Sequence, residues 1–174
     1  MLEGKVIRVN KISYHEKLEE VLLQLVNGAF LTVSDGNEKN TMTIGWGTIG
    51  YIWNRPIFEV LVRESRYTYK MLAKSDEFTV SVPLKGQLED ELSYCGSKSG
   101  SDVDKFSQLN LQTSPGKILS TPFISKCDIF YECEILYQSR MERSDLIQKI
   151  KKDCYPQSDY HKIFYGEIIA AYES

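Results

Sequence analysis

The sequence predicts a mainly β fold, an antiparallel barrel with helices at its periphery. Segments rich in β-branched and aromatic residues outnumber segments with helical periodicity. Most neighbouring strand segments also lie too close in the chain for the dozen or more residues of a βαβ crossover, so antiparallel pairing is expected. The 174 residues suit one domain, and no internal repeat or low-complexity linker divides them. We therefore expect a single domain over residues 1–174.

The first elements are predicted to be a strand over residues 5–10 and a helix over residues 15–28. The helix carries apolar residues at intervals of three and four, which places them on one face: Leu18, Val21, Leu22, Leu25 and Val26. Gly28 is placed to end this helix in a left-handed conformation. Two strands follow, over residues 29–33 and 41–47, and the polar turn between them indicates a hairpin.

The middle of the chain predicts a strand over residues 57–63, a helix over residues 65–75 and a strand over residues 77–83. Ser65 is in position to cap the N-terminus of that helix. The remaining predicted elements are a helix at 87–95 closed by Gly96, a short helical piece at 101–109, one long strand or a bent pair at 123–141, a small helix at 143–152 and a final strand at 162–173.

Composition limits the classes of function. Hydrophobic residues make up 42% and charged residues 26% of the chain, as in ordinary soluble proteins. No run approaches the roughly 18 apolar residues of a membrane span, and the N-terminus lacks the apolar core of a signal peptide, so a cytoplasmic location is expected. The net charge of −3 argues against nonspecific nucleic-acid binding. Four cysteines without C-x-x-C spacing are expected to be reduced: Cys95, Cys127, Cys133 and Cys154.

Three separate stretches carry hydrogen-bond donors for one phosphate group, and the first lies on the predicted strand at residues 41–47. Thr41 and Thr43 alternate along this strand, so both hydroxyls lie on one face. Met42 and Ile44 then lie on the other face. The alternative is that both threonines are ordinary β-forming residues on a solvent face.

The second stretch is the start of the predicted helix at residues 65–75. Arg63, Ser65 and Arg66 stand where free backbone N–H groups and the positive end of the helix dipole favour an anion. The planar fork of an arginine also matches phosphate oxygens. The alternative is that the two arginines form surface ion pairs with nearby acidic residues: Glu59, Glu64 or Asp76.

The third stretch connects two predicted helical pieces. Ser97, Lys98 and Ser99 lie between Gly96 and Gly100, and these glycines let the backbone turn and approach a ligand. Two carboxylates that follow would repel a phosphate and are expected to cap the next helix: Asp102 and Asp104. The alternative is a flexible surface loop, and the stretch does not match a P-loop.

Trp46 stands between Gly45 and Gly47, so a flat ring can approach the backbone beside the indole. A core tryptophan beside a β-bulge is the alternative. Because the stretch adjoins the phosphate donors, we favour a flat, phosphorylated cofactor.

Neither histidine stands in a metal-ligand spacing. His15 and His161 are expected to be structural or exposed, although His161 could approach the cofactor ring from the last strand. Cys95 lies beside a lysine at a predicted helix end, conditions that lower a thiol pKa. The favoured interpretation of Cys95 is nevertheless a small buried packing residue.

Five stretches together are specific enough to indicate a family. They read NTMTIGWGTIGYIWNRP at 40–56, VRESRYTYKML at 62–72, FTVSVP at 78–83, LSYCGSKSGSDVDKF at 92–106 and HKIFYGEII at 161–169. In residue type and order they resemble the flavin reductase-like family of FMN-binding split barrels. The resemblance runs from about Gly28 to Tyr172, most of the chain.

The resemblance implies FMN bound without a covalent bond, at the interface of a homodimer. It also implies electron transfer between NADH or NADPH, the flavin, and a redox partner protein or a small acceptor. Flavin supplies the redox chemistry, so no catalytic side chain and no metal are expected. Position by position, the resemblance implies a cofactor site made of Thr41, Met42, Thr43, Ile44, Trp46, Gly47, Thr48, Arg63, Ser65, Arg66, Tyr67, Ser97, Lys98 and Ser99, with Lys105 nearby.

Two other functions stay open on the sequence alone. One is a flavin-binding electron carrier or sensor without its own nicotinamide site, which acts through a protein partner. The other is a split barrel that binds a different flat ligand, haem or a deazaflavin, although no axial haem ligand stands beside Trp46.

Overall fold

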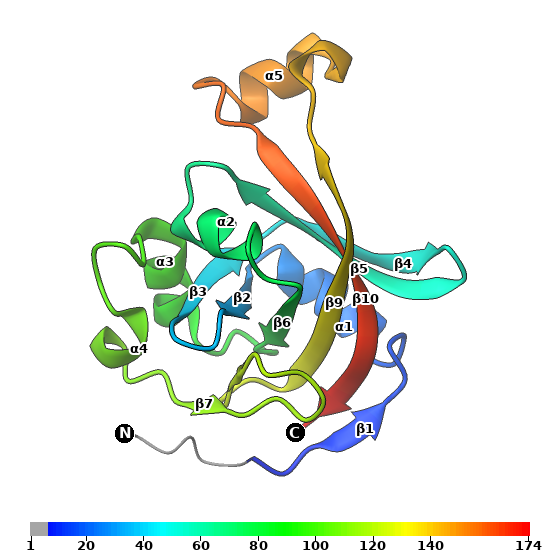
Figure 1. Ribbon diagram of the computed structural model, residues 1–174, viewed down its shortest axis with the longest axis vertical. Coiled ribbons are helices and arrows are strands. Elements are labelled where there is room, and N and C mark those ends of the chain that lie inside the picture. Colours follow the sequence, from blue (N-terminus) through cyan, green and yellow to red (C-terminus); the bar gives the residue numbers. More distant parts are fainter. Residues whose placement is uncertain (1–6) are drawn as a thin grey trace.

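The computed structural model describes residues 7–174, and strands dominate it (Figure 1). The large sheet consists of β1 (Asn10–Ile12), β2 (Ala29–Ser34), β3 (Lys39–Ile44), β4 (Gly47–Ile52), β5 (Arg55–Arg63), β6 (Glu77–Val82), β9 (Ile129–Arg140) and β10 (His161–Glu173). A small second sheet pairs β7 (Thr113–Ser114) with β8 (Phe123–Ile124). The helices are α1 (Leu18–Leu25), α2 (Tyr67–Leu72), α3 (Glu89–Ser97), α4 (Lys105–Gln108), the 3-10 turn η1 (Arg143–Asp145) and α5 (Gln148–Cys154).

The large sheet is antiparallel and curls back on itself. Its strands are ordered β3-β2-β6-β9-β10-β5-β4, with β1 paired to β10. Only Gly45 and Trp46 separate the edge strands β3 and β4 in the chain. Two edges joined by two residues must lie close together, so the twisted sheet closes into a barrel whose split lies between β3 and β4. The predicted antiparallel, mainly β architecture is confirmed.

Two long features project from the barrel (Figure 1). β9 and β10 run side by side beyond the other strands and carry α5 at their far end, and their pairing continues to Lys162 opposite Arg140. β4 and β5 form a hairpin whose turn residues, Trp53 and Asn54, both have positive φ angles, of 55° and 58°. Two consecutive residues with positive φ are typical of a tight type I′ turn.

The predicted strands agree with the structure except at two places. Of the strand predicted over residues 5–10, only Asn10 is in a strand, as the first residue of β1. Residues 7–9 are not in a strand, and residues 5 and 6 lie outside the described residues. The strand predicted over 41–47 stops at the end of β3, because the chain leaves one edge of the sheet there and enters the opposite edge as β4. Residues 123–141 form a bent pair, β8 and β9, rather than one strand.

The first helix buries only part of its predicted apolar face. Val21 and Leu25 are buried against the sheet, whereas Leu22 is 42% and Val26 is 81% exposed. α1 is therefore shorter and less completely packed than its periodicity predicts. Gly28 has a φ angle of 114°, the positive value expected of a residue that ends a helix.

The predicted helix caps are partly wrong. α2 begins after Ser65 and Arg66, and no side chain caps it, so Ser65 is not its N-cap. Gly96 lies inside α3 and does not close it. The cap predicted for α4 is confirmed, since the Asp104 carboxylate accepts hydrogen bonds from two backbone N–H groups of the helix. Asp102 instead accepts a hydrogen bond from the Ser101 hydroxyl.

The two faces of the sheet carry separate apolar clusters. One includes Phe58 and Tyr131, whose rings meet edge to face at 5.3 Å. The other packs beneath α3 and β8 and includes Cys95, Phe123 and Phe130. Burial of such aromatic side chains is the main stabilising term in a barrel of this size. Between residues 7 and 174, the helices are all too short or too polar to cross a membrane.

Candidate functional site

A pocket of about 170 Å³ lies at the split of the barrel. The end of β3, the link to β4, β5, the start of α2 and the start of β10 meet there. Its lining consists of Met42, Thr43, Ile44, Gly45, Trp46, Leu61, Arg63, Arg66 and His161. Six of these were predicted as site residues: Met42, Thr43, Ile44, Trp46, Arg63 and Arg66. The fold therefore brings the first two predicted stretches to one cavity.

An aromatic wall borders this pocket. Trp46 is 43% exposed, so it is not a core tryptophan, and its ring centroid lies 4.9 Å from that of His161. Tyr155 stands edge-on to both rings, 6.2 Å from Trp46 and 5.6 Å from His161. Tyr155 in turn stacks on Tyr160 at a centroid distance of 4.9 Å. The indole of Trp46 thus remains open to a flat ligand while its surroundings are held by packing.

Arg63 and Ser65 anchor the segment between α5 and β10. The Arg63 guanidinium donates hydrogen bonds to the backbone carbonyl oxygens of Asp159 and Cys154, the second at 3.1 Å. It also lies 5.2 Å from the ring centroid of Tyr155, within cation–π range. The Ser65 hydroxyl donates to the Asp159 carboxylate at 2.7 Å. Both residues therefore hold Tyr155 beside the pocket, and of the two only Arg63 lines it.

Two cations bind carbonyl oxygens in the last turn of α3. Arg66 donates from Nη1 to the oxygen of Gly96 at 3.1 Å. The Lys105 ammonium donates to the oxygens of Cys95 at 3.0 Å and Thr41 at 2.9 Å, and the residue is only 3% exposed. This end of a helix carries the negative pole of its dipole, which favours cations. Burial lowers the pKa of Lys105. Lys105 holds α3 against β3 and does not line the pocket at the split.

The third predicted stretch begins where Arg66 is anchored. Ser97 follows Gly96 directly, and its hydroxyl donates to a carbonyl oxygen of the preceding turn. Lys98 is exposed, and the Ser99 hydroxyl bonds another serine of the same loop. None of the three lines the pocket itself. The bond from Arg66 to Gly96 nevertheless places the start of this stretch next to a residue that does.

Besides Ser65, Lys105 and residues 97–99, four further predicted site residues do not line the pocket: Thr41, Gly47, Thr48 and Tyr67. Thr41 is fully buried and donates its hydroxyl to a carbonyl oxygen of β2, so Thr43 alone of the two threonines reaches the pocket. The Thr43 hydroxyl donates to a carbonyl oxygen of α3 at 2.6 Å. Gly47 and Thr48 pair with β5. The Tyr67 hydroxyl donates to a carboxylate in the turn before β3.

His161 is the pocket residue that sequence reasoning underrated. It is 8% exposed and stands opposite Arg63 in the pairing of β10 with β5. Burial, and then the guanidinium groups of Arg63 and Arg66, lower the pKa of His161 to about 4. The imidazole is therefore neutral at neutral pH. No local pattern marks this residue as part of the pocket, because the indole and the two cations beside it belong to Trp46, Arg63 and Arg66, about 100 residues earlier in the chain.

Cys95 is a packing residue, as favoured from the sequence. It lies on the buried face of α3, and this burial raises the pKa of its thiol to about 11. A thiol with a raised pKa is a poor nucleophile at neutral pH. Across residues 7–174, no group of three or more histidine, cysteine or acidic side chains is arranged to hold a metal ion.

Three glycines near the pocket have the spacing G-x-G-x-x-G: Gly45, Gly47 and Gly50. In dinucleotide-binding folds this spacing follows a strand and opens a helix. Here it spans the link between β3 and β4 and continues along β4, with no helix. A Cβ added at Gly47 would lie 2.8 Å from the carbonyl oxygen of Glu59, so this glycine lets β4 approach β5 closely. The spacing therefore reflects strand pairing.

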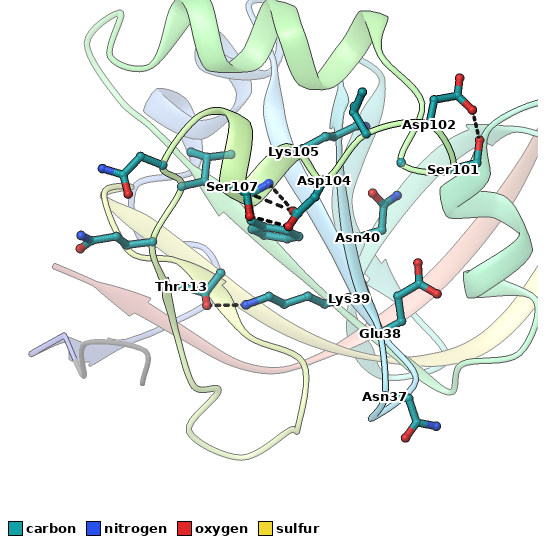
Figure 2. Close-up of a pocket in the computed structure, with 16 residues that line it drawn as sticks. Asn37, Glu38, Lys39, Asn40, Ser101, Asp102, Asp104, Lys105, Ser107 and Thr113 are labelled. Atoms are coloured by element: carbon teal, nitrogen blue, oxygen red, sulfur yellow. Dashed lines mark hydrogen bonds between the residues drawn. The ribbon is translucent and has the colours of Figure 1, made fainter. Parts of the chain in front are cut away.

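A larger cavity, of about 920 Å³, lies between the β2–β3 turn, residues 100–107 and residues 110–113 (Figure 2). Its lining has three carboxylates, those of Glu38, Asp102 and Asp104, against the two ammonium groups of Lys39 and Lys105, and Asp104 is engaged as the cap of α4. The Lys39 ammonium there already donates to the Thr113 hydroxyl at 2.9 Å (Figure 2). Acidic groups repel a phosphate. The smaller, cationic pocket at the split is therefore the better candidate site.

Residues 26–174 match the family described as the flavin reductase like domain. The chain belongs to this family. The flavin reductase-like chain is also similar to an uncharacterized protein of Archaeoglobus fulgidus, with 27% identity over 140 residues that cover 80% of this chain and 68% of the relative. The family resemblance seen in the motifs is confirmed.

Solved structures give the same result for the fold. Flavoredoxin from Methanosarcina acetivorans superposes with a TM-score of 0.65 and 27% identity, covering 84% of this chain and 68% of its own. The FMN-binding protein from Thermus thermophilus with bound 1-cyclohex-2-enone superposes with a TM-score of 0.64 and 25% identity, covering 84% of this chain and 69% of its own. The split-barrel fold is thus shared with FMN-binding proteins.

Proposed function

We propose that this flavin reductase-like chain binds FMN noncovalently in the pocket at the split and transfers electrons from NADH or NADPH to a partner protein or a small acceptor. The observation that carries the proposal is the meeting of Trp46 with the guanidinium groups of Arg63 and Arg66. Among the described residues, no carboxylate lines this pocket. Because the whole chain has a net charge of −3, the positive charge is local to the pocket. FMN combines a flat ring with a phosphate, which fits this pairing of features.

The phosphate is assigned to the space between the start of α2 and the end of α3. Arg66 uses Nη1 for the Gly96 oxygen, and a guanidinium has five N–H donors in all. Ser97 and Lys98 follow at once and are exposed, and Ser99 is half-buried. Donors of this kind, a guanidinium and an ammonium with hydroxyl groups, are the ones that phosphate oxygens bind best.

The flavin ring is assigned to the space beside Trp46. β3 is an edge strand, so backbone N–H and C=O groups on its outer side have no strand partner. Only every second residue of an antiparallel strand turns these groups outward, and Thr43 belongs to the same outward set as Thr41, whose carbonyl oxygen accepts from Lys105. The backbone groups of Thr43 are therefore available to the polar edge of a ring, while Trp46 and His161 supply aromatic surface. When bound, FMN supplies the hydride and single-electron chemistry. The residues named here bind and orient the ring.

We further propose a homodimer in which a second copy covers the flavin. A cavity of about 170 Å³ is smaller than the roughly 300–1,000 Å³ of typical ligand pockets, so one chain does not enclose FMN. Exposed apolar side chains occur near the pocket: Trp46 lines it, and the end of α1, which carries the exposed Val26, approaches Gly45, since a Cβ added there would lie 3.7 Å from the Leu25 oxygen. Light scattering is expected to give the mass of a dimer. A monomer that binds FMN tightly would contradict this arrangement.

Titration with FMN tests the binding proposal. Arg66→Ala removes a charged donor from the pocket and is expected to raise the dissociation constant for FMN at least tenfold, since a charge-assisted hydrogen bond contributes about 1.5–3 kcal/mol. Arg8→Ala is the matched control, because Arg8 is exposed and precedes β1, which pairs with the end of β10 opposite to His161. Equal FMN affinity in the two variants would refute the assignment.

Anaerobic mixing with NADH and NADPH tests the donor. If the flavin-loaded protein accepts hydride from a nicotinamide, the visible absorption band of its oxidised flavin disappears after mixing. A loaded protein that binds FMN but keeps its colour with both nucleotides would be an electron carrier that depends on a protein donor. That outcome would refute the nicotinamide part of the proposal and leave FMN binding intact.

A further inference from the structure

His161 makes one side-chain hydrogen bond and turns its other ring nitrogen toward the pocket. Its Nδ1 lies 2.8 Å from the hydroxyl oxygen of Tyr155. Its Nε2 has no hydrogen-bond partner within residues 7–174. Among the described residues, the fully buried side-chain nitrogen and oxygen atoms that lack a hydrogen-bond partner are Ser125 Oγ and Tyr131 Oη. Nε2 of His161 is not among them, so it is not fully buried. Because His161 lines the pocket, Nε2 faces the open space there.

The surroundings decide which atom carries the shared proton. Tyr155 is 4% exposed, and burial raises the pKa of its phenol, so the hydroxyl keeps its proton at neutral pH. Within residues 7–174, that hydroxyl has one hydrogen-bond partner, Nδ1 of His161. A proton on Nδ1 would leave the buried phenolic hydrogen without an acceptor, which is unfavourable. Tyr155 therefore donates, Nδ1 accepts, and the imidazole proton resides on Nε2.

The charges near His161 keep the ring neutral. Arg63, at the end of β5, and Arg66, just before α2, are the cations that face it, and Asp159 is the nearby carboxylate on its own segment. Together with burial, the two guanidinium groups outweigh Asp159, and the pKa of His161 falls to about 4. At neutral pH the pocket wall thus offers an uncharged N–H group beside two fixed positive charges.

We propose that Tyr155 is a positioning residue that fixes His161 as the Nε2–H tautomer, so that the pocket presents a neutral N–H donor to a carbonyl oxygen of the flavin ring. The identity of the acceptor rests on the proposed FMN binding, whereas the tautomer does not. The arrangement also explains why Tyr155 is anchored so fully. The Arg63 guanidinium and the stack on Tyr160 hold the phenol where it meets Nδ1. A mobile phenol would let the imidazole proton change sides.

Nitrogen-15 NMR of the full chain reads the tautomer directly. The chain has only two histidines, and His15 is exposed, so a His15→Gln variant assigns the His161 signals. At pH 7, His161 is expected to be neutral with its proton on Nε2. Tyr155→Phe should turn this into a mixture of both tautomers. Tyr160→Phe is the matched control, since it removes a phenolic oxygen from the same stack but not the bond to Nδ1.

Binding of FMN tests the second half of the proposal. The dissociation constant is expected to about double in Tyr155→Phe, because only about half of the chains then keep the Nε2–H form that donates to the flavin, and to stay at the wild-type value in Tyr160→Phe. Addition of FMN to the wild-type chain should also shift the Nε2–H signal of His161. Purely structural damage in Tyr155→Phe would change the melting temperature without redistributing the tautomers.

The outcomes separate this inference from the proposed function. A proton on Nδ1 in the wild type, or an unchanged tautomer in Tyr155→Phe, overturns the positioning role even if FMN binds. An unmoved Nε2–H signal and equal FMN affinity in the variant overturn the flavin contact. A wild-type chain that takes up no FMN overturns the proposed function and the acceptor with it, while the tautomer result stands on its own.

Discussion

Lys105→Met tests whether the buried ammonium supports the fold around the site. Lys105 donates to the Thr41 oxygen at 2.9 Å and the Cys95 oxygen at 3.0 Å. Hydrogen bonds that involve a charged group contribute about 1.5–3 kcal/mol each, so two are worth roughly 3–6 kcal/mol. Methionine is one heavy atom shorter than lysine and fills most of the same space without a buried charge, so part of that stabilisation is regained. We therefore expect the free energy of unfolding to fall by about 2–4 kcal/mol.

Urea titration measures this change, with Lys126→Met as the control for removal of an exposed lysine. The control should shift the free energy of unfolding by less than about 0.5 kcal/mol. FMN affinity should fall in Lys105→Met as well, because the end of α3 is no longer held against β3. A Lys105→Met chain with wild-type stability but no FMN binding would refute this reasoning. It would instead show that Lys105 contacts the cofactor, as the family resemblance implies.

Three further changes test separate parts of the structure. Glu132→Ala removes a fully buried carboxylate that accepts backbone N–H bonds from residues 117–119 at 2.9–3.0 Å, and the free energy of unfolding should fall by about 3–5 kcal/mol in urea. Between pH 6.5 and about 4 the unfolded chain binds a proton that folded His161 does not, so acid should remove about 2–3 kcal/mol of stability over that interval. Gly47→Ala forces a Cβ to within 2.8 Å of the Glu59 oxygen, and a loss of about 1–3 kcal/mol should appear as a lower melting temperature.

Each of these three predictions has a control variant. Glu134→Ala, at an exposed position of the same strand, should be nearly neutral, and equal losses at Glu132 and Glu134 would contradict the carboxylate's role. His161→Gln should lack the acid-dependent step seen in the wild type, and an identical pH profile would assign that step to other groups. Gly50→Ala is expected to be tolerated, because a Cβ there meets nothing within 4 Å. Equal tolerance at Gly47 would contradict the close approach of β4 to β5.

Local patterns were enough to predict most of the sheet. The strands near 29–33, 57–63 and 77–83 are runs of β-branched and aromatic residues whose side chains pack into the core, so composition and burial agree. The break at Trp46 was not predictable in this way. The chain leaves the sheet there because its two edges meet, which depends on closure of the whole barrel. The exposed face of α1 is a similar case, since periodicity reports an apolar face but not what covers it.

The candidate site, like the sheet, was predictable from local sequence patterns only in part. Residue types around Trp46 and Arg66 predicted a flat, phosphorylated ligand, and the fold does bring these two residues to one pocket. The partners of Arg63 were beyond sequence reasoning, because its guanidinium bonds carbonyl oxygens more than 90 residues away.

Lys105 and His161 each combine a partner nearby in the chain with distant ones. Lys105 bonds Cys95 and also Thr41 on β3, and His161 bonds Tyr155 and also lies beside Trp46. The distant contacts, which no local motif encodes, decide where these two residues lie in the fold.

Tryptophan fluorescence tests FMN binding at the split most directly. The chain contains two tryptophans, Trp46 at the pocket and Trp53 at the tip of the β4–β5 hairpin. In a Trp53→Phe variant, added FMN is expected to quench the emission of Trp46 and to saturate at one FMN per chain. If FMN leaves Trp46 unquenched, or quenches only the Trp53 that remains in Trp46→Phe, flavin does not occupy this pocket and the account is contradicted.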